Sequence, residues 1–135
     1  MRTYAGVILV DPDGRIALQE RDDRPDVVNP GRVTTFGGLA ESAETPVAAA
    51  CRELHEELGI TVVAEQLAEI MVRAKIDHDG LTTRCVVYSL AVPDVDRLQV
   101  AEGTGALVGP PARVLSDSRL TETCALAVRA LPRPR

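Results

Sequence analysis

Three glutamates, Glu53, Glu56 and Glu57, offer the clearest chemistry in this sequence of 135 residues. Their spacing places them side by side on a helix surface, and they would lie in its last turns, where the helix dipole disfavours carboxylates. The resulting local cost is on the order of 1–2 kcal/mol. Because hard divalent cations bind clustered oxygen ligands, a magnesium ion would convert this cost into binding. The alternative interpretation is a solvated acidic face.

The helix that carries these glutamates is predicted over Thr45–Leu58. Thr45 is a suitable N-cap, Pro46 fits the first helical position, and Gly59 is a natural stop after the last turn. At helical spacing, one stripe of apolar residues forms the predicted buried face, and the three glutamates fan away from it. That stripe comprises Val47, Cys51, Leu54 and Leu58.

The segment Gly38–Ile60 fits, without a gap, the pattern G-x(5)-E-x(7)-R-E-U-x-E-E-x-G-U, where U is a bulky aliphatic residue. On this motif the chain resembles the Nudix hydrolases. The resemblance implies an α/β (α+β) fold, an α/β/α sandwich with a mixed β-sheet, formed by a single domain over residues 1–135. It also implies Mg²⁺-dependent hydrolysis of a phosphoanhydride bond, with Mn²⁺ as a substitute metal.

The same resemblance assigns roles inside the motif. It implies that Glu53, Glu56 and Glu57 bind the metal and act in catalysis. Arg52 would pair with one of these carboxylates and hold it in position. Glu44, near the helix start, would be structural or a partner of the residues that bind the metal.

Three glycines and one arginine complete the expected site. The carbonyl of Gly37 is a candidate further metal ligand, and Gly37 and Gly38 would let the backbone approach the metal and the pyrophosphate closely. Gly59 ends the helix. Arg21 follows the second predicted strand, where relatives often place a residue that contacts substrate phosphate; the alternative is a surface ion pair with a neighbouring aspartate.

A carboxylate outside the motif is expected to serve as a further ligand or as the general base. Glu102, which precedes a glycine, is the first candidate, with a solvated loop residue as the alternative. Asp94 and Asp96 are better explained as turn formers.

Strands and helices alternate along the rest of the chain. We expect a hairpin over 4–10 and 15–19, a short strand over 33–36, a strand over 82–92, and a last helix over 121–131. The stretch 61–74 fits either a helix or a strand. Leu107 and Val108 indicate one more short strand.

Composition limits the alternatives. The net charge of −5 argues against a protein that coats nucleic acid, and no run of residues is apolar enough to cross a membrane. Three widely spaced cysteines, Cys51, Cys85 and Cys124, favour core positions in a reducing, cytoplasmic compartment. A homodimer is compatible with the sequence.

The substrate is expected to be a small nucleotide. Markers of several Nudix subgroups are missing, which favours (deoxy)nucleoside triphosphates or modified versions of them. An ADP-ribose or nucleotide-sugar pyrophosphatase is the alternative enzyme. A non-catalytic module that senses a nucleotide is the alternative from another class, although such modules typically lose glutamates of the motif.

Overall fold

The structure is a computed structural model that describes residues 1–26, 29–101 and 105–132. A mixed sheet forms its centre, with β1 (Arg2–Val10), β2 (Ile16–Glu20), β3 (Val33–Thr34), β4 (Phe36–Leu39), β5 (Leu67–Ile76), β6 (Thr82–Ala91) and β7 (Gly105–Gly109). The main path runs β3-β2-β1-β6-β5. The pair β1 and β6 is parallel, whereas β4 pairs antiparallel with β1 and β7 antiparallel with β2.

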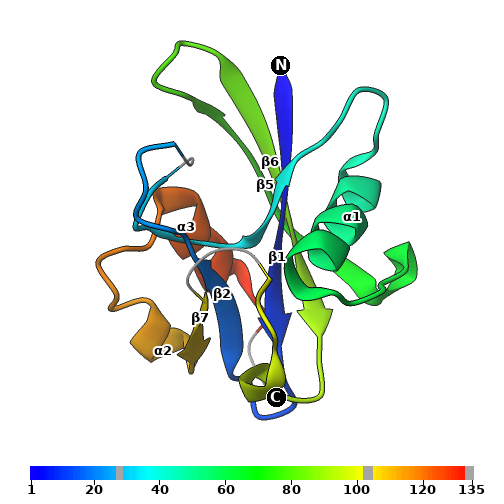
Figure 1. Cartoon of the computed structure of the whole chain (residues 1–135), viewed down its shortest axis with the longest axis vertical. Coiled ribbons are helices and arrows are strands. Elements are labelled where there is room, and N and C mark those ends of the chain that lie inside the picture. The colour runs from blue at the N-terminus through cyan, green and yellow to red at the C-terminus, as the bar shows by residue number, and fades with distance from the viewer. Residues whose placement is uncertain (27–28, 102–104, 133–135) are drawn as a thin grey trace.

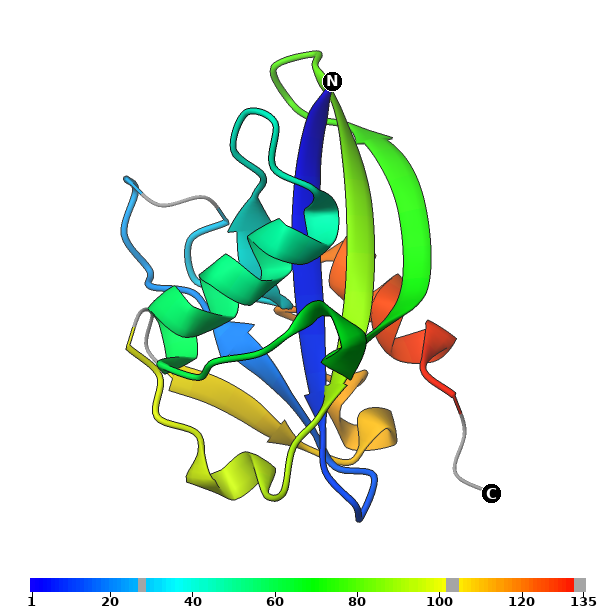
Figure 2. The ribbon, with the colours of Figure 1, turned by 90° about the vertical axis from the view of Figure 1, so that its right-hand side faces the viewer.

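Helices cover both faces of this sheet, so the expected three-layer arrangement is confirmed. The long helix α1 (Pro46–Leu58) lies on one face, and α3 (Glu122–Ala130) lies on the other, as Figures 1 and 2 show. The short helix α2 (Pro111–Val114) follows β7. Two single turns of 3-10 helix, Ala64–Gln66 and Val95–Arg97, complete the elements.

Each helix layer has its own apolar core. Alternate residues of β1, among them Ala5 and Val7, pack with Leu54 and Leu58 of α1. The intervening residue Ile8 packs on the other face with α2 and α3. This alternation follows from the period of two in a strand, which lets one central strand serve both layers.

The predicted elements agree with the structure except in three places. The ambiguous stretch 61–74 becomes a 3-10 turn followed by β5, which lies at the edge of the sheet and has a register shift between Glu69 and Met71. The expected strand over 33–36 is two short strands, interrupted at Thr35. The helix α2 was not predicted, because four residues are too few to show a helical period.

The predicted buried stripe of α1 was partly wrong. Leu54 and Leu58 are buried, but Val47 and Cys51 are only half-buried. The small residues Ala49 and Ala50 are buried instead, together with one predicted metal ligand, Glu57. Because alanines let the helix approach the sheet closely, the buried face is rotated toward them and toward the glutamate.

The cysteine prediction was also partly wrong. Cys85 and Cys124 are buried, whereas Cys51 is half-buried, and all three are free thiols. Burial raises the pKa of the Cys124 thiol to about 12, so this side chain is a packing residue.

As for membranes, none of the helices in the described part of the chain has the length and apolar run needed to cross a bilayer.

Candidate metal and pyrophosphate site

Helix α1 is held at both ends by the residues that the sequence indicated. The Thr45 hydroxyl accepts a hydrogen bond from the Ala48 N–H at 3.2 Å. At the other end Gly59 adopts a left-handed conformation, with φ of 67°, and donates its N–H to the carbonyl of His55 at 2.9 Å. His55 itself is exposed. The glutamates therefore project from a helix whose start and end are fixed.

Glu57 is the most buried of the three, with 1% of its surface exposed. Its Oε1 accepts a hydrogen bond of 2.7 Å from the backbone N–H of Gly37. The expectation that all three glutamates fan away from the core was therefore wrong for this residue. A buried carboxylate needs charged or polar partners, and this bond joins α1 directly to β4.

Gly37 of β4 is required by a backbone contact, whereas Gly38 leaves room for the end of the Glu53 side chain. Gly37 has φ of 136°, and a Cβ there would lie 2.0 Å from the Ala5 carbonyl oxygen. A Cβ on Gly38 would lie 2.5 Å from Oε1 of Glu53. Since any side chain would fill this space, the glycine pair allows the strand and the carboxylates of α1 to lie against each other.

Arg52 is the centre of the charged cluster. Its guanidinium contacts Glu44 at 2.9 Å, Glu53 at 3.0 Å and Glu56 at 3.3 Å. It also contacts Glu41 at 3.0 Å and donates to the carbonyl of Leu39 at 3.2 Å. The hydrogen bonds to Glu44, Glu53 and Glu56 hold the pKa of Arg52 above its ordinary value, with Glu44 the largest contributor.

Glu44 forms the most complete pair in this cluster. Both of its oxygens accept from Arg52 at 2.9 Å, in the two-point geometry that suits a guanidinium and a carboxylate. One oxygen also accepts from the backbone N–H of Glu41. These bonds, first of all the one from Arg52, lower the pKa of Glu44 to about 2.

The remaining predicted site residues lie in different places. Arg21 donates to Oε1 of the buried Gln19 at 3.4 Å. Asp94 caps the turn Val95–Arg97, as expected of a turn former, by accepting a hydrogen bond from the Asp96 N–H at 2.9 Å. The Asp96 side chain instead forms an ion pair with Arg15 at 2.5 Å. Glu102 lies outside the described residues. The preceding Ala101 donates its N–H to the Glu57 carbonyl at 2.7 Å, which brings the chain to the end of α1.

Sequence reasoning missed Glu41. It lies in the loop before α1 and contacts Arg52, although 67% of its side chain is exposed. The sequence does show a second acidic residue three positions before Glu44. The motif accepts any residue at that position, so Glu41 was not assigned a role.

The donor set fits a hard divalent cation. Glu53, Glu56 and Glu57 supply carboxylate oxygens from successive turns, and Gly38 leaves the space that Glu53 occupies. In the described ranges no three acidic, histidine or cysteine side chains converge into a ready metal site. Instead, Glu53 and Glu56 are gathered around the guanidinium of Arg52. A cation therefore already organises these carboxylates, and a metal ion would have to bind beside it.

Comparison with known proteins shows the family of this chain. The model of the NUDIX domain matches residues 1–108, and the chain therefore belongs to the Nudix family. An uncharacterised Nudix hydrolase of Rhodococcus erythropolis is 38% identical over 77 residues, which cover 56% of this chain and 42% of that relative. The chain thus spans less than half the length of this curated relative.

Solved structures show the same fold. A MutT Nudix hydrolase from Burkholderia pseudomallei superposes with a TM-score of 0.77 and 26% identity, covering 97% of this chain and 98% of that one. The MutT protein of Methanosarcina mazei gives a TM-score of 0.80 at 16% identity, covering 95% and 90% of the two chains. Because the Methanosarcina mazei protein is only 16% identical, its likeness to this chain concerns the fold alone.

Proposed function

We propose that this chain is a divalent-metal-dependent pyrophosphohydrolase that cleaves a phosphoanhydride bond in a nucleoside diphosphate linked to another group. The observation that carries the proposal is the contact between α1 and β4. There the buried Glu57 binds the N–H of Gly37, and Glu53 lies against Gly38. Carboxylates are thus placed beside a glycine-lined strand that a pyrophosphate can approach.

Each residue of the site has a part in this proposal. Glu53, Glu56 and Glu57 would hold Mg²⁺, or Mn²⁺ in its place, with the Gly37 carbonyl as a further ligand. When bound, the metal supplies charge neutralisation at the phosphate oxygens and a more nucleophilic water. Arg52 keeps Glu53 and Glu56 from separating, and Glu44 in turn fixes Arg52. Arg21 would contact substrate phosphate.

Glu102 is proposed to accept the proton of the attacking water or to complete the metal site. The described part of the chain supports this through Ala101, whose N–H binds the last turn of α1. We expect Glu102→Gln to lower kcat by about 10-fold or more, and Asp94→Asn and Asp96→Asn to stay within about 3-fold of the parent. Steady-state kinetics of the three variants test this. An unimpaired Glu102→Gln enzyme would leave the base among the glutamates of α1.

The substrate proposed is a (deoxy)nucleoside triphosphate or a modified form of one. ADP-ribose and nucleotide sugars are the alternative substrates. The test is the formation of a nucleoside monophosphate from each compound of a panel of these substrates, with Mg²⁺ and with excess chelator. Hydrolysis that a chelator abolishes is expected. Full activity in chelator would contradict the metal role, and tight binding without turnover would indicate a sensing module.

A further inference from the structure

Helix α1 leaves part of its own side of the sheet uncovered. It packs mainly on β4 and β1. Figure 2 shows it crossing in front of these strands, whereas the upper part of β5 and β6, in green, lies beside it. The segment that joins α1 to β5 crosses only the lower end of these two strands. The uncovered part therefore lies next to β5, the last strand on the path of the sheet.

Three apolar residues of β5 form this uncovered surface, and we call them the β5 strip: Val72, Ala74 and Ile76. Val72 lies opposite Val86, whose side chain belongs to the core under α1, so the strip points to the same side of the sheet. All three residues are exposed, Val72 to 44% and Ile76 to 78%. Apolar residues gathered on one face of an edge strand indicate a contact surface for another protein chain.

Two charged residues lie at matching positions on either side of the strip. Arg84 and Tyr88 are each two residues from Val86 on β6, in opposite directions, and Glu69 lies opposite Tyr88 on β5. Glu69 and Arg84 are therefore each about 7 Å along the strands from the level of Val86. Burial raises the pKa of Tyr88, Glu69 raises it further and Arg84 lowers it, so both charges act on the face that Tyr88 occupies. Both side chains are exposed, and among the described residues neither has an ion-pair partner.

A two-fold axis relates these two charged positions. The axis lies in the plane of contact, passes beside Val72, and runs at a right angle to the line from Glu69 to Arg84. It turns a second copy face to face with the first and places Glu69 of each copy over Arg84 of the other. The same ion pair thus forms twice, with apolar surface between the two pairs. A closed dimer requires this kind of self-complementary surface.

We infer that a second copy of this chain binds face to face on the β5 strip, with Val72 at the two-fold axis and a Glu69–Arg84 ion pair on each side. The strip is smaller than the roughly 800 Å² per partner of a standard interface, so the dimer is weak, with a Kd of about 10–100 μM. The contact leaves the carboxylate site open, because Glu53 and Glu57 contact β4. The inference therefore does not depend on the proposed hydrolase activity.

Sedimentation velocity of the full chain, over about 1–500 μM, measures the dimer. Arg84→Glu and Glu69→Arg each set like charges against each other at both contacts, so each should raise the Kd about 10-fold or more. The double variant Arg84→Glu/Glu69→Arg exchanges the charges and should return the Kd to within about 3-fold of the wild type. Arg129→Glu is the matched control, because it reverses an exposed arginine on α3, across the sheet, and should change the Kd by less than about 2-fold.

Mixing the two single variants gives the sharpest test. After Arg84→Glu both positions carry glutamate, and after Glu69→Arg both carry arginine. A mixed dimer therefore has opposite charges at both contacts, whereas each variant alone has like charges. An equimolar mixture should dimerise about as tightly as the wild type, and salt at about 1 M should weaken both dimers.

Two results would overturn the inference. One is a wild type that sediments as a monomer at every concentration. The other is a dimer that responds to Arg84→Glu and Glu69→Arg no more than to Arg129→Glu, because such a dimer uses another surface. Circular dichroism melting verifies that each variant is folded. Hydrolysis of the substrate panel at about 1 μM protein, where the monomer prevails, tests the proposed function separately and should agree among all variants to within about 2-fold.

Discussion

Two clusters in this protein are built around an arginine, and they differ in their balance of charge. Arg52 contacts the carboxylates of Glu41, Glu44, Glu53 and Glu56. Arg119 contacts Asp117 through two bonds and Glu20 at 2.9 Å. The Arg52 cluster therefore carries a much larger excess of negative charge than the Arg119 cluster.

The excess has a physical consequence. Like charges held together repel unless a further cation joins them, and a divalent cation is the most effective candidate. Around Arg119 the charges nearly balance, and its backbone carbonyl also accepts the N–H of Val33 at 3.0 Å. The second cluster therefore joins β2, β3 and the loop before α3, whereas the first is suited to bind a ligand.

The largest effect is expected from Glu56→Gln. This change removes a charge from the ligand-binding cluster, and we expect kcat/KM to fall about 100-fold or more. Stability should hardly change, because 46% of the Glu56 side chain is exposed and its contact with Arg52 is 3.3 Å. Steady-state kinetics and thermal denaturation of the same preparation measure both. Asp117→Asn, in the balanced cluster, is the control and should keep its activity; a collapse of stability in Glu56→Gln would make the residue structural.

The next largest effect is expected when the guanidinium of Arg52 is removed. Arg52→Gln leaves four carboxylates without their guanidinium, so we expect activity to fall about 10-fold or more. Because repulsion in the variant is greater, added Mg²⁺ should raise its denaturation midpoint more than that of the wild type. Thermal denaturation at several Mg²⁺ concentrations measures this difference. Equal shifts in the two proteins would show that the metal and Arg52 do not share these carboxylates.

Arg119→Gln should lower stability and leave activity nearly unchanged, which is the opposite of the result expected for Glu56→Gln. It breaks a partly exposed network, so we expect the denaturation midpoint to fall by about 2–4 °C and kcat/KM to stay within about 3-fold. Steady-state kinetics and thermal denaturation measure these two changes. Lost activity at unchanged stability would place Arg119 in the function of the protein and remove the contrast between the clusters.

The two clusters also differ in how well the sequence predicts them. The carboxylates of the Arg52 cluster lie within a short stretch of loop and helix, so helical spacing and the motif predict that they are neighbours. Arg119 and Glu20 are 99 residues apart, and only the pairing of strands makes them neighbours. The hairpin, α1 and its caps were predicted for the same reason, since each depends on local residues.

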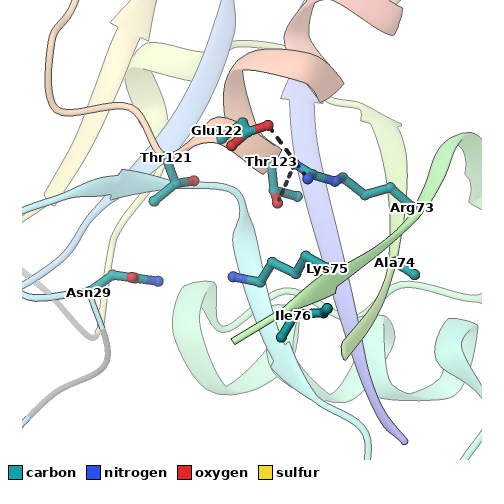
Figure 3. Close-up of a pocket in the computed structure, with 8 residues that line it drawn as sticks. All are labelled: Asn29, Arg73, Ala74, Lys75, Ile76, Thr121, Glu122 and Thr123. Atoms are coloured by element: carbon teal, nitrogen blue, oxygen red, sulfur yellow. Dashed lines mark hydrogen bonds and ion pairs between the residues drawn. The ribbon is translucent and has the colours of Figure 1, made fainter. Parts of the chain in front are cut away.

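What the sequence did not predict depends on packing between distant segments. Glu57 was expected to be exposed with its neighbours, but the bond to Gly37 needs β4 against α1. A cavity of about 430 Å³ forms where the end of β5, the start of α3 and the loop before β3 meet (Figure 3), and no local sequence pattern indicates it. The stretch 61–74 was ambiguous because an edge strand with a register shift shows no regular period of two.

The smallest effect is a dependence of stability on pH. The pKa of Glu44 is lowered to about 2, chiefly by the bonds from Arg52, so its ionised form is favoured in the folded state. Its stabilising contribution is complete above the ordinary carboxyl pKa of about 4.3 and is lost as the pH falls through the folded value. We therefore expect the gap in unfolding free energy between wild type and Glu44→Gln to narrow steadily between these two pH values.

Urea denaturation of both proteins at intervals across that range measures the gap. Glu65→Gln, which removes an exposed carboxylate away from Arg52, controls for the loss of one negative charge. A gap that stays constant with pH would mean that Glu44 contributes through the shape of the loop before α1. A gap that narrows would show that the charge on Glu44 holds Arg52, and through it Glu53 and Glu56, in place.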